Sequence, residues 1–527
     1  MHVPVLIVGG GPIGLTASVL LSQFGIESLL VNQRPTTSTH PRARFIDVRT
    51  TEILRQMGLA DEVLATGLPR EWVDSVRYSR SLSEPEIHRL PTASYDCEPR
   101  DWSPTVPIMS AQDLVEPIML EAARSYDTAS VRFGTELIAI GHDDEACRAT
   151  LRDLASGDEM EVSADFVIGA DGRRSSVRRL LGGDLDVGFT QSGSIQDVLY
   201  HADMSRWVGD RTGALLFVMH ERGYGLFQPM DGVTRWQAQC TTFTPPIAAA
   251  DVTEADCVEW IRSAIGDTDG ELEIDVEGIA PWTPEARLSD DFRRGRVVLA
   301  GDAAHMLYPT GGLGMNLGYH GIHNLVWKLA FVLRGLAADG LLETYEIERR
   351  PQADRTRNTS VENARLAGDL YRTYLTGGDV DEAAHRLRQY GNFEGLILAP
   401  EYMSSLCRTE SERGPEVEND LVDFVPCVRA GRRAPHVWLD ATRTVSVLDH
   451  FGAEYVLLAT AGSPSERSAR ARERRAAGFP IRTEQLPETV VGDLYASGED
   501  VLVRPDGIVA ARLAHNEHVD FASLLPR

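Results

Sequence analysis

The chain has few cysteines and no long apolar run, and both shortages narrow what it can be. Six cysteines are scattered through 527 residues, with no Cys-x-x-Cys pair and no cluster with histidine at metal-ligand spacing. No apolar stretch approaches the roughly 20 residues that a membrane-spanning helix needs. The N-terminus begins directly on a predicted strand, without a basic region or a cleavage site. We therefore expect a cytoplasmic protein with reduced thiols, no bound metal and no membrane partner.

Positive charge is also in short supply. The chain has 52 lysine and arginine residues against 78 aspartate and glutamate residues, which gives a formal net charge of −26 and a pI near 5.0. Such an acidic balance argues against nucleic acid and anionic membranes as partners. With 43% hydrophobic and 25% charged residues the composition is that of an ordinary globular protein, and the length predicts two to four domains.

A glycine-rich turn near the N-terminus carries the first functional signal. The apolar run Val5–Val8 predicts a strand, Leu15–Ser22 predicts a helix, and Gly9-Gly-Gly-Pro-Ile-Gly14 lies between them. Gly9, Gly11 and Gly14 have the spacing of the dinucleotide fingerprint, whose glycines permit a tight turn, backbone approach to a pyrophosphate and close helix–strand packing. The helix N-terminus would present free N–H groups and a positive dipole end to the phosphates.

Two further strand-and-turn segments follow much later in the chain. Ala164–Gly169 predicts a strand that leads to Asp171-Gly172, and Arg296–Ala300 predicts another that leads to Gly301-Asp302. The stretch Pro309-Thr-Gly-Gly-Leu-Gly-Met-Asn316 then precedes a long apolar-periodic helix. Its three glycines would let the backbone approach a planar ring that side chains would block. The start of that helix would favour an anionic group beside it.

These three motifs, in this order, resemble the single-component FAD-dependent aromatic hydroxylases, the family of para-hydroxybenzoate and phenol hydroxylases. Within that family the chain is most similar to bacterial enzymes that hydroxylate polyketides and other aromatic natural products. The resemblance implies an α/β fold with a Rossmann-like FAD-binding domain of the para-hydroxybenzoate hydroxylase type. It also implies an antiparallel β substrate domain and a thioredoxin-like C-terminal domain.

Composition along the chain divides it in keeping with that resemblance. We expect residues 1–182 to form the first part of the FAD-binding domain, with a Pro- and Ser-rich connecting loop at 82–108. Strand-like alternation at 183–285 predicts the substrate sheet, and residues 286–408 would return to the FAD-binding domain with its long helices. Residues 420–527 would form the thioredoxin-like domain, which lacks Cys-x-x-Cys and therefore redox chemistry. Within it, Glu466–Arg475 predicts a solvated helix face.

The resemblance also assigns cofactor contacts. Gly9, Gly11 and Gly14 would hold the FAD pyrophosphate, and Asp302 would accept hydrogen bonds from the ribityl chain. Asn32 stands where the family usually has a glutamate for the adenosine ribose, and its amide would bind that ribose more weakly than a carboxylate. The other expected cofactor contacts are Arg42 and, second to it, Arg44, together with Gln112, Asp171, Gly312, Gly314, Met315 and Asn316.

The implied reaction couples oxidation of NADPH or NADH to transfer of one oxygen atom from O2 to an aromatic substrate, through a flavin C4a-hydroperoxide. Pro309 resembles the family proline whose carbonyl lies near the site of oxygen attack. The candidates for a base that deprotonates a phenol are His220 and Tyr224, with His201 and His305 as equal claimants, because a base needs a pKa near the working pH. The side chains expected to line the substrate pocket are aromatic: Tyr200, Phe217, Phe227 and Trp236.

Several alternatives stay open at this point. The same flavin cradle would serve ring-opening (Baeyer–Villiger) oxygenation or dehydrogenation, and a non-catalytic flavin-binding protein would share it. The glycines at 311–314 argue against a non-catalytic binder, which has no need of an opening beside the flavin ring. The Trp-x-Trp-x-Ile-Pro signature of flavin halogenases and the Gly-x-Ser-x-Gly elbow of hydrolases are absent. The sequence identifies neither the substrate nor the preference between NADH and NADPH, and it leaves a homodimer open.

Overall fold

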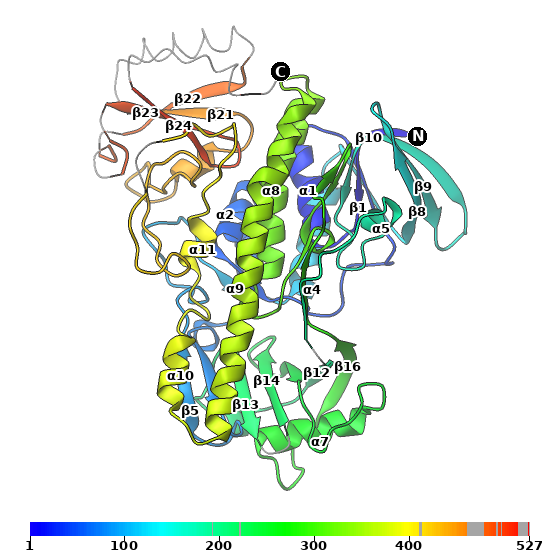
Figure 1. The fold of residues 1–527 in the computed structure, drawn as a ribbon, viewed down its shortest axis with the longest axis vertical. Helices are drawn as coiled ribbons and strands as arrows, with labels where there is room; N and C mark the ends of the chain where they lie inside the picture. The colour runs from blue at the N-terminus through cyan, green and yellow to red at the C-terminus, as the bar shows by residue number, and fades with distance from the viewer. Residues whose placement is uncertain are drawn as a thin grey trace.

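The computed structural model describes residues 1–191, 193–220, 223–410, 414–460, 479–487, 489–491, 494–496, 498–514 and 525. The helix face expected at Glu466–Arg475 lies outside these residues. A parallel sheet, a second sheet below it and a C-terminal sheet beside it form the main layers, and two long helices run through the middle (Figure 1).

The first sheet has a parallel centre because its strands alternate with helices along the chain. Its order is β18-β19-β10-β1-β2-β7, with β9 and β8 continuing antiparallel from β10. The central strand β1 is buried along most of its length, which explains the uninterrupted apolar run at its end. The bounds are β1 (His2–Val8), β2 (Ser28–Asn32), β7 (Ala129–Phe133), β8 (Thr135–His142), β9 (Cys147–Asp153), β10 (Glu159–Gly169), β18 (Arg293–Arg294) and β19 (Val297–Leu299).

Helices cover this sheet and connect it to the rest of the molecule. The helix α9 runs from the level of the parallel sheet down to the second sheet, where α10 lies beside it (Figure 1). The helices are α1 (Pro12–Gln23), α2 (Val48–Met57), α3 (Ala60–Leu64), α4 (Gln112–Arg124), α5 (Ser176–Leu180), α8 (Leu313–Leu333), α9 (Glu343–Leu375), α10 (Val380–Arg386) and α11 (Glu394–Leu398). Short strands link the layers: β3 (Phe45–Ile46), β6 (Ile108–Met109), β11 (Phe189–Thr190), β17 (Glu285–Leu288) and β20 (His305–Met306).

The second sheet has the order β16-β12-β15-β14-β13-β4-β5. All its neighbours are antiparallel except β13 and β4, which pair in parallel. The connecting loop expected at 82–108 contains β5, an edge strand whose polar and mostly accessible residues conceal it in the sequence. The bounds are β4 (Ser75–Ser79), β5 (Glu86–Pro91), β12 (Ile195–His201), β13 (Leu215–His220), β14 (Gly223–Pro229), β15 (Arg235–Cys240) and β16 (Asp275–Trp282), with the short helix α6 (Ser205–Val208) after β12 and α7 (Glu254–Ile265) after β15.

Side chains alternate between the two faces of the second sheet. On one face, Val218 and Ala238 pack with residues of α7 in a buried cluster. On the opposite face, Phe217 shares a cluster with Phe45 and with Leu313 at the start of α8. We call this opposite face the inner face, since it points toward the parallel-sheet domain.

The C-terminal sheet completes the α/β fold that the sequence predicts. Its order is β22-β21-β23-β24, with β21 and β22 parallel and the other pairs antiparallel, as in a thioredoxin-like domain. The bounds are β21 (Tyr455–Ala459), β22 (Ile481–Gln485), β23 (Glu499–Val503) and β24 (Val509–Ala514). Among the described residues no helix is long and apolar enough to cross a membrane.

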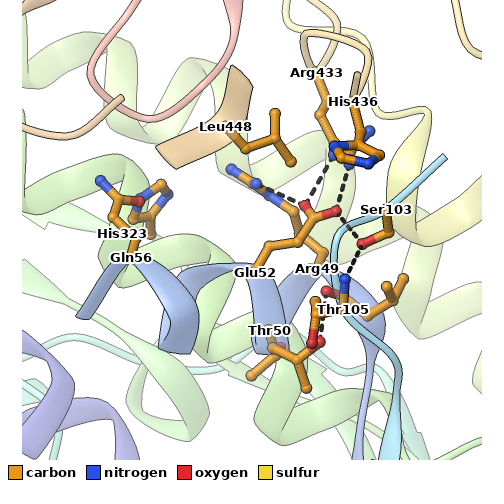
Figure 2. A network of polar contacts seen from close by, with 12 residues as sticks. Arg49, Thr50, Glu52, Gln56, Ser103, Thr105, His323, Arg433, His436 and Leu448 are labelled. Carbon is orange, nitrogen blue, oxygen red and sulfur yellow. Dashed lines mark hydrogen bonds and ion pairs between the residues drawn. The ribbon is translucent and has the colours of Figure 1, made fainter. Parts of the chain in front are cut away.

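A network of buried polar contacts fastens the C-terminal segment to α2 (Figure 2). Glu52 on α2 pairs with Arg433 and with Arg49, and it accepts a hydrogen bond of 2.7 Å from the hydroxyl of Ser103. A second buried cluster joins Lys328 on α8 and Glu348 on α9, whose nitrogen and oxygen are 2.8 Å apart, to Arg504 of the C-terminal segment. The C-terminal segment is therefore held against the helix that leads from the third glycine-rich motif.

Candidate active site

The turn from Gly9 to Gly14 forms a tight cradle, and a side chain in place of two of its glycines would clash with the backbone. Gly9 has a φ of +116°, and a Cβ there would lie 2.2 Å from the carbonyl oxygen of Ala170. A Cβ on Gly14 would lie 1.9 Å from the carbonyl oxygen of Gly9. Gly11 differs, because the nearest atom to its Cβ position is Oε1 of Glu116, 4.0 Å away. The space beside Gly11, at the uncapped start of α1, is thus open, as a bound pyrophosphate requires.

Asp302 follows β19 and lies among arginines. Its side chain is accessible to solvent, yet the protein around it raises the pKa of its carboxyl, while the charges of Arg173 and Arg42 act in the opposite direction. Asp302 receives no hydrogen bond from the described residues and can accept one from a ligand hydroxyl. Burial and the neighbouring Arg34 lower the pKa of Arg42. This group of positive charges suits the anionic part of a dinucleotide.

Asn32 and Gln112 both border the cradle, as expected. Asn32 ends β2, and its Cβ lies 2.9 Å from the position that a Cβ on Gly10 would take. Gln112 begins α4, and its side-chain amide donates to the carboxylate of Glu116. The other oxygen of that carboxylate accepts a 2.6 Å hydrogen bond from the backbone N–H of Ser38, while burial raises the pKa of Glu116. Sequence reasoning missed Glu116, because a single glutamate in mid-helix belongs to no recognisable motif.

The carboxylate of Asp171 accepts hydrogen bonds from local groups, and its expected cofactor contact stays a prediction. One oxygen accepts a 2.5 Å hydrogen bond from the hydroxyl of Ser175. The other accepts from the backbone N–H groups of Ser176 and Val177, at 2.6 and 3.0 Å. Asp171 therefore holds the first turn of α5, the role of an N-terminal capping side chain.

Of the three glycines around the start of α8, only Gly314 faces open space, because a Cβ on Gly311 or Gly312 would lie 2.9 Å from the side chain of Phe393 or Phe45. Gly312 caps α8 with a φ of +68°, and its N–H donates to the carbonyl oxygen of Pro309 at 3.0 Å. A Cβ on Gly314 would meet nothing closer than the Cβ of Leu307, at 3.9 Å. The N–H groups of Leu313, Gly314 and Met315 have no partner within the helix, and they are available to a planar ligand.

The side chain of Asn316 makes four hydrogen bonds within the protein. Its oxygen accepts from the N–H of Asp47 at 2.9 Å and from the hydroxyl of Thr50 at 2.8 Å. Its nitrogen donates to the carbonyl oxygens of Phe45 and Gly312, at 2.9 and 3.0 Å. Since all four bonds stay within the protein, Asn316 fixes the start of α8 against β3 and α2 and leaves cofactor binding to the backbone.

Arg44, the second arginine expected at the cofactor, points away from the cradle. Its guanidinium donates to the side chain of Gln228 at 2.9 Å and to the carbonyl oxygens of Pro229 and Ala214, both at 2.6 Å. Burial lowers its pKa to about 10. Arg44 therefore ties the second sheet to the parallel-sheet domain, and only Arg42 of the two faces the cofactor space.

The aromatic residues expected at the substrate pocket lie on both faces of the second sheet. Tyr200, Phe227 and Trp236 are fully buried in the cluster that includes α7, on the outer face. His220 lies against Trp260 of α7, with ring centroids 5.3 Å apart. These four residues belong to the outer core, and the structure does not bring them to the inner face where a pocket beside α8 would lie.

Phe217 and Tyr224 are on the inner face and form an aromatic stack. Phe217 lies parallel to Tyr78, with centroids 5.0 Å apart and an interplanar angle of 7°. Tyr224 stacks on its other side at 5.8 Å and 12°. Tyr390 meets Phe217 edge-on at 6.4 Å. The two tyrosines cover both faces of Phe217, and the stack shares a buried cluster with Leu313 at the start of α8.

Two of the expected bases have pKa values far from neutral pH. Burial raises the pKa of Tyr224 well above its ordinary value, so the neutral phenol persists at all working pH values. Burial lowers the pKa of His305 to about 3, so this imidazole takes a proton only in strong acid. His201 is half-exposed and lies 3.5 Å from Glu277, and its role as a base stays a prediction.

Comparison with known proteins gives consistent matches along the chain. Two protein-family models match: FAD binding domain over residues 2–360 and aromatic-ring hydroxylase, C-terminal, over residues 428–526. A putative polyketide hydroxylase of Streptomyces halstedii is 32% identical, over 97% of this chain and 93% of that protein. The 4-methyl-5-nitrocatechol 5-monooxygenase of a Burkholderia species is 32% identical, over 97% and 94% of the two chains. The structure of the flavin-dependent monooxygenase PieE in complex with FAD and substrate has a TM-score of 0.88 at 29% identity, covering 98% of this chain and 96% of that chain.

Proposed function

The chain belongs to the FAD-dependent aromatic-ring hydroxylases, and from that premise we propose that it uses NADPH or NADH and O2 to hydroxylate a phenolic or polycyclic aromatic compound of natural-product type. The observation that carries the proposal is the position of the aromatic stack. Phe217 lies in one buried cluster with Leu313, the first residue of the helix whose open N-terminus suits a flavin ring.

Holding the cofactor is the first task of the chain's own residues. Gly9, Gly11 and Gly14 leave room for the pyrophosphate, and Arg42 supplies positive charge beside it. Asp302 offers its carboxylate to the ribityl hydroxyls. The N–H groups at the start of α8 favour negative charge on the pyrimidine end of the flavin. When bound, FAD supplies electron transfer from NAD(P)H and the activation of O2.

Positioning the substrate is the second task. Since Phe217 is covered on both faces, it and Tyr224 would meet a substrate ring edge-to-face, and aromatic pairs of this kind add about 0.5–1.5 kcal/mol beyond their buried area. Phe393 and Met219 are buried in the same cluster and help to exclude water. The carbonyl of Pro309, which accepts from the N–H of Gly312 in the turn before α8, would lie near the site of oxygen attack.

The reductant would bind transiently. One dinucleotide fingerprint is present in the sequence, and it lies between β1 and α1. NADPH or NADH would therefore bind without a Rossmann domain of its own.

Anaerobic reduction of the purified holoenzyme by NADPH, followed by flavin absorbance, tests the proposal. We expect an aromatic substrate to accelerate reduction many-fold over the rate without it, as a substrate-gated hydroxylase requires. Phe217→Leu should lose most of that acceleration, whereas Phe227→Leu, an equally buried change on the outer face, should retain it. Fast reduction that no phenolic or polycyclic compound alters would contradict the proposal.

A further inference from the structure

The inner face of the second sheet has a polar half as well as an aromatic half. Asp197 on β12 and Gln239 on β15 are paired in register, and Gln237 is the next inner-face residue along β15. The side-chain amide of Gln237 donates a 2.6 Å hydrogen bond to Oδ1 of Asp197. Leu199, two residues beyond Asp197, clusters with Ala111 of the parallel-sheet domain, which confirms that this side of β12 faces inward.

Asp197 is a buried carboxyl with little compensation. It is 7% exposed and Gln237 is 2% exposed, and the amide of Gln237 is the one donor that the described residues give it. An ionised carboxylate in such a place is costly unless further donors reach it. Burial accordingly raises the pKa of Asp197 to about 7, although the hydrogen bond from Gln237 and the charge of Arg42 act in the opposite direction.

The surroundings offer few charges that would satisfy Asp197. On β16 its inner-face neighbours are Ala280 and Trp282, and on β15 they are the neutral Gln237 and Gln239. The indole Nε1 of Trp282 is buried and makes no hydrogen bond with the described residues, so its N–H is available as a donor.

The remaining ionisable groups on this side already act on one another. Arg235 is paired with Asp113 at 2.7 Å and with Glu277 at 3.3 Å. The same three groups and Arg42 act on His40, whose pKa is lowered mainly by burial. Arg42 is thus the one ionic group that acts on Asp197 directly.

We propose that Asp197, held by Gln237, accepts a hydrogen bond from a free hydroxyl at one end of a polycyclic aromatic substrate whose other end lies on Phe217 and Tyr224. This proposal rests on the proposed function and adds to it a pair of residues, Asp197 and Gln237, that determines substrate specificity. From β13 to β12 there are three strand intervals, a span of about 14 Å at the usual spacing between strands. A single phenol ring does not bridge that distance, whereas several fused rings do.

The experiment measures equilibrium binding to the oxidised holoenzyme, without NADPH, by the change in flavin absorbance or fluorescence. The probes are 2-hydroxyfluorene and 2-methoxyfluorene. Both are planar, but the methoxy group has no hydrogen that it could donate. We expect wild type to prefer the hydroxyl compound about tenfold or more, as for a hydrogen bond to a charged group. The isosteric Asp197→Asn should reduce this preference to near unity while FAD content stays unchanged. The wild-type preference should also grow between pH 6 and pH 8, and that of Asp197→Asn should not.

Gln237→Leu and Gln196→Leu form a matched pair of controls. Both glutamines are buried on neighbouring strands, but Gln196 is on the outer face, where its amide donates to the carbonyl oxygen of Ala249 at 3.4 Å. The inner change should lower the hydroxyl preference and the outer change should not. Failure of wild type to bind 2-hydroxyfluorene, or equal preferences in wild type and Asp197→Asn, would overturn the inference. Loss of oxygen insertion with this binding pattern intact would instead count against the proposed function alone.

Discussion

Glu52 on α2 and Arg433 of the C-terminal segment form an ion pair in which each side chain is 2% exposed (Figure 2). The two residues are far apart in sequence, and the pair joins the cofactor-binding part of the molecule to the part that follows it. Arg433 lowers the pKa of Glu52, although burial alone would raise it. The pair is therefore ionised in the folded protein and belongs to the structure rather than to the chemistry.

Removing one partner of this buried pair should be strongly destabilising. Glu52→Gln leaves the guanidinium of Arg433 without a counter-charge, and changes of this kind cost about 3–5 kcal/mol. Urea unfolding of the holoenzyme measures the loss. The control is Asp449→Asn, which breaks the pair between Arg55 and Asp449 at the same interface. Those side chains are 32% and 29% exposed, so we expect a cost below about 1 kcal/mol. Equal losses in the two variants would contradict this account of the interface.

Gly11→Ala should weaken FAD binding without unfolding the protein. Its Cβ would occupy the open space beside α1, where the nearest protein atom is 4.0 Å away and the pyrophosphate is expected. We predict at least a tenfold higher dissociation constant for FAD, measured by fluorescence titration of the apoprotein, with an unchanged thermal midpoint of that apoprotein. Gly141→Ala is the control, because its Cβ would also meet nothing within 4 Å but lies on β8, away from the cradle. Normal FAD binding by Gly11→Ala would place the pyrophosphate elsewhere.

Arg42→Ala and Arg44→Ala should separate cofactor binding from stability. Arg42 contributes charge beside Asp302, so its loss should raise the FAD dissociation constant about tenfold and leave the apoprotein's unfolding free energy nearly unchanged. Arg44 makes three buried hydrogen bonds across the domain boundary, so its loss should cost about 3 kcal/mol or more. Paired measurements of FAD affinity and urea unfolding test the contrast. Weaker FAD binding by the Arg44 variant alone would contradict these roles of the two arginines.

The titration of Asp197 gives stability a measurable pH dependence. Its pKa is about 7 in the folded protein, against 3.8 for an ordinary aspartate. As pH rises from 4 to 7, the unfolded chain loses this proton first, and the folded state therefore loses stability relative to it. Asp197→Asn removes the effect, so the variant's unfolding free energy minus that of wild type should rise by roughly 3 kcal/mol between pH 4 and pH 7, at about 1.4 kcal/mol per pKa unit.

The control for that measurement is Asp153→Asn. Asp153 is exposed, and backbone N–H groups lower its pKa rather than raise it. The difference between this variant and wild type should stay flat from pH 4 to pH 7. A flat difference for Asp197→Asn as well would show that Asp197 is not buried as described.

Local motifs made much of the cofactor site predictable. Gly9, Gly11 and Gly14 combine backbone demands with a fixed spacing, so strand, turn and helix could be placed from sequence. Asp302 and the glycines before α8 were placed in the same way. The roles of Arg42 and Arg44 could not be separated, because both lie in one loop and only packing of the distant Gln228 and Ala214 turns Arg44 away.

The substrate side was less predictable for a geometric reason. Alternation reveals that a strand has two faces, but it does not tell which face meets the cofactor. Tyr224 and Phe227 are three residues apart on β14 and so lie on opposite faces, although both were expected at the pocket. Choosing residues for aromatic character also passed over Asp197 and Gln237, which are polar residues at inner-face positions of buried strands.

In the proposed reaction this chain inserts one oxygen atom from O2 into an aromatic ring at the expense of NAD(P)H. The most direct measurement is turnover under ¹⁸O2 of an aromatic compound that stimulates flavin reduction, with mass spectrometry of the product and a parallel assay of NADPH consumed. We expect one labelled oxygen atom in each product molecule and one NADPH oxidised for each product formed. NADPH oxidation that yields only hydrogen peroxide, or a product whose new oxygen comes from water, would contradict it.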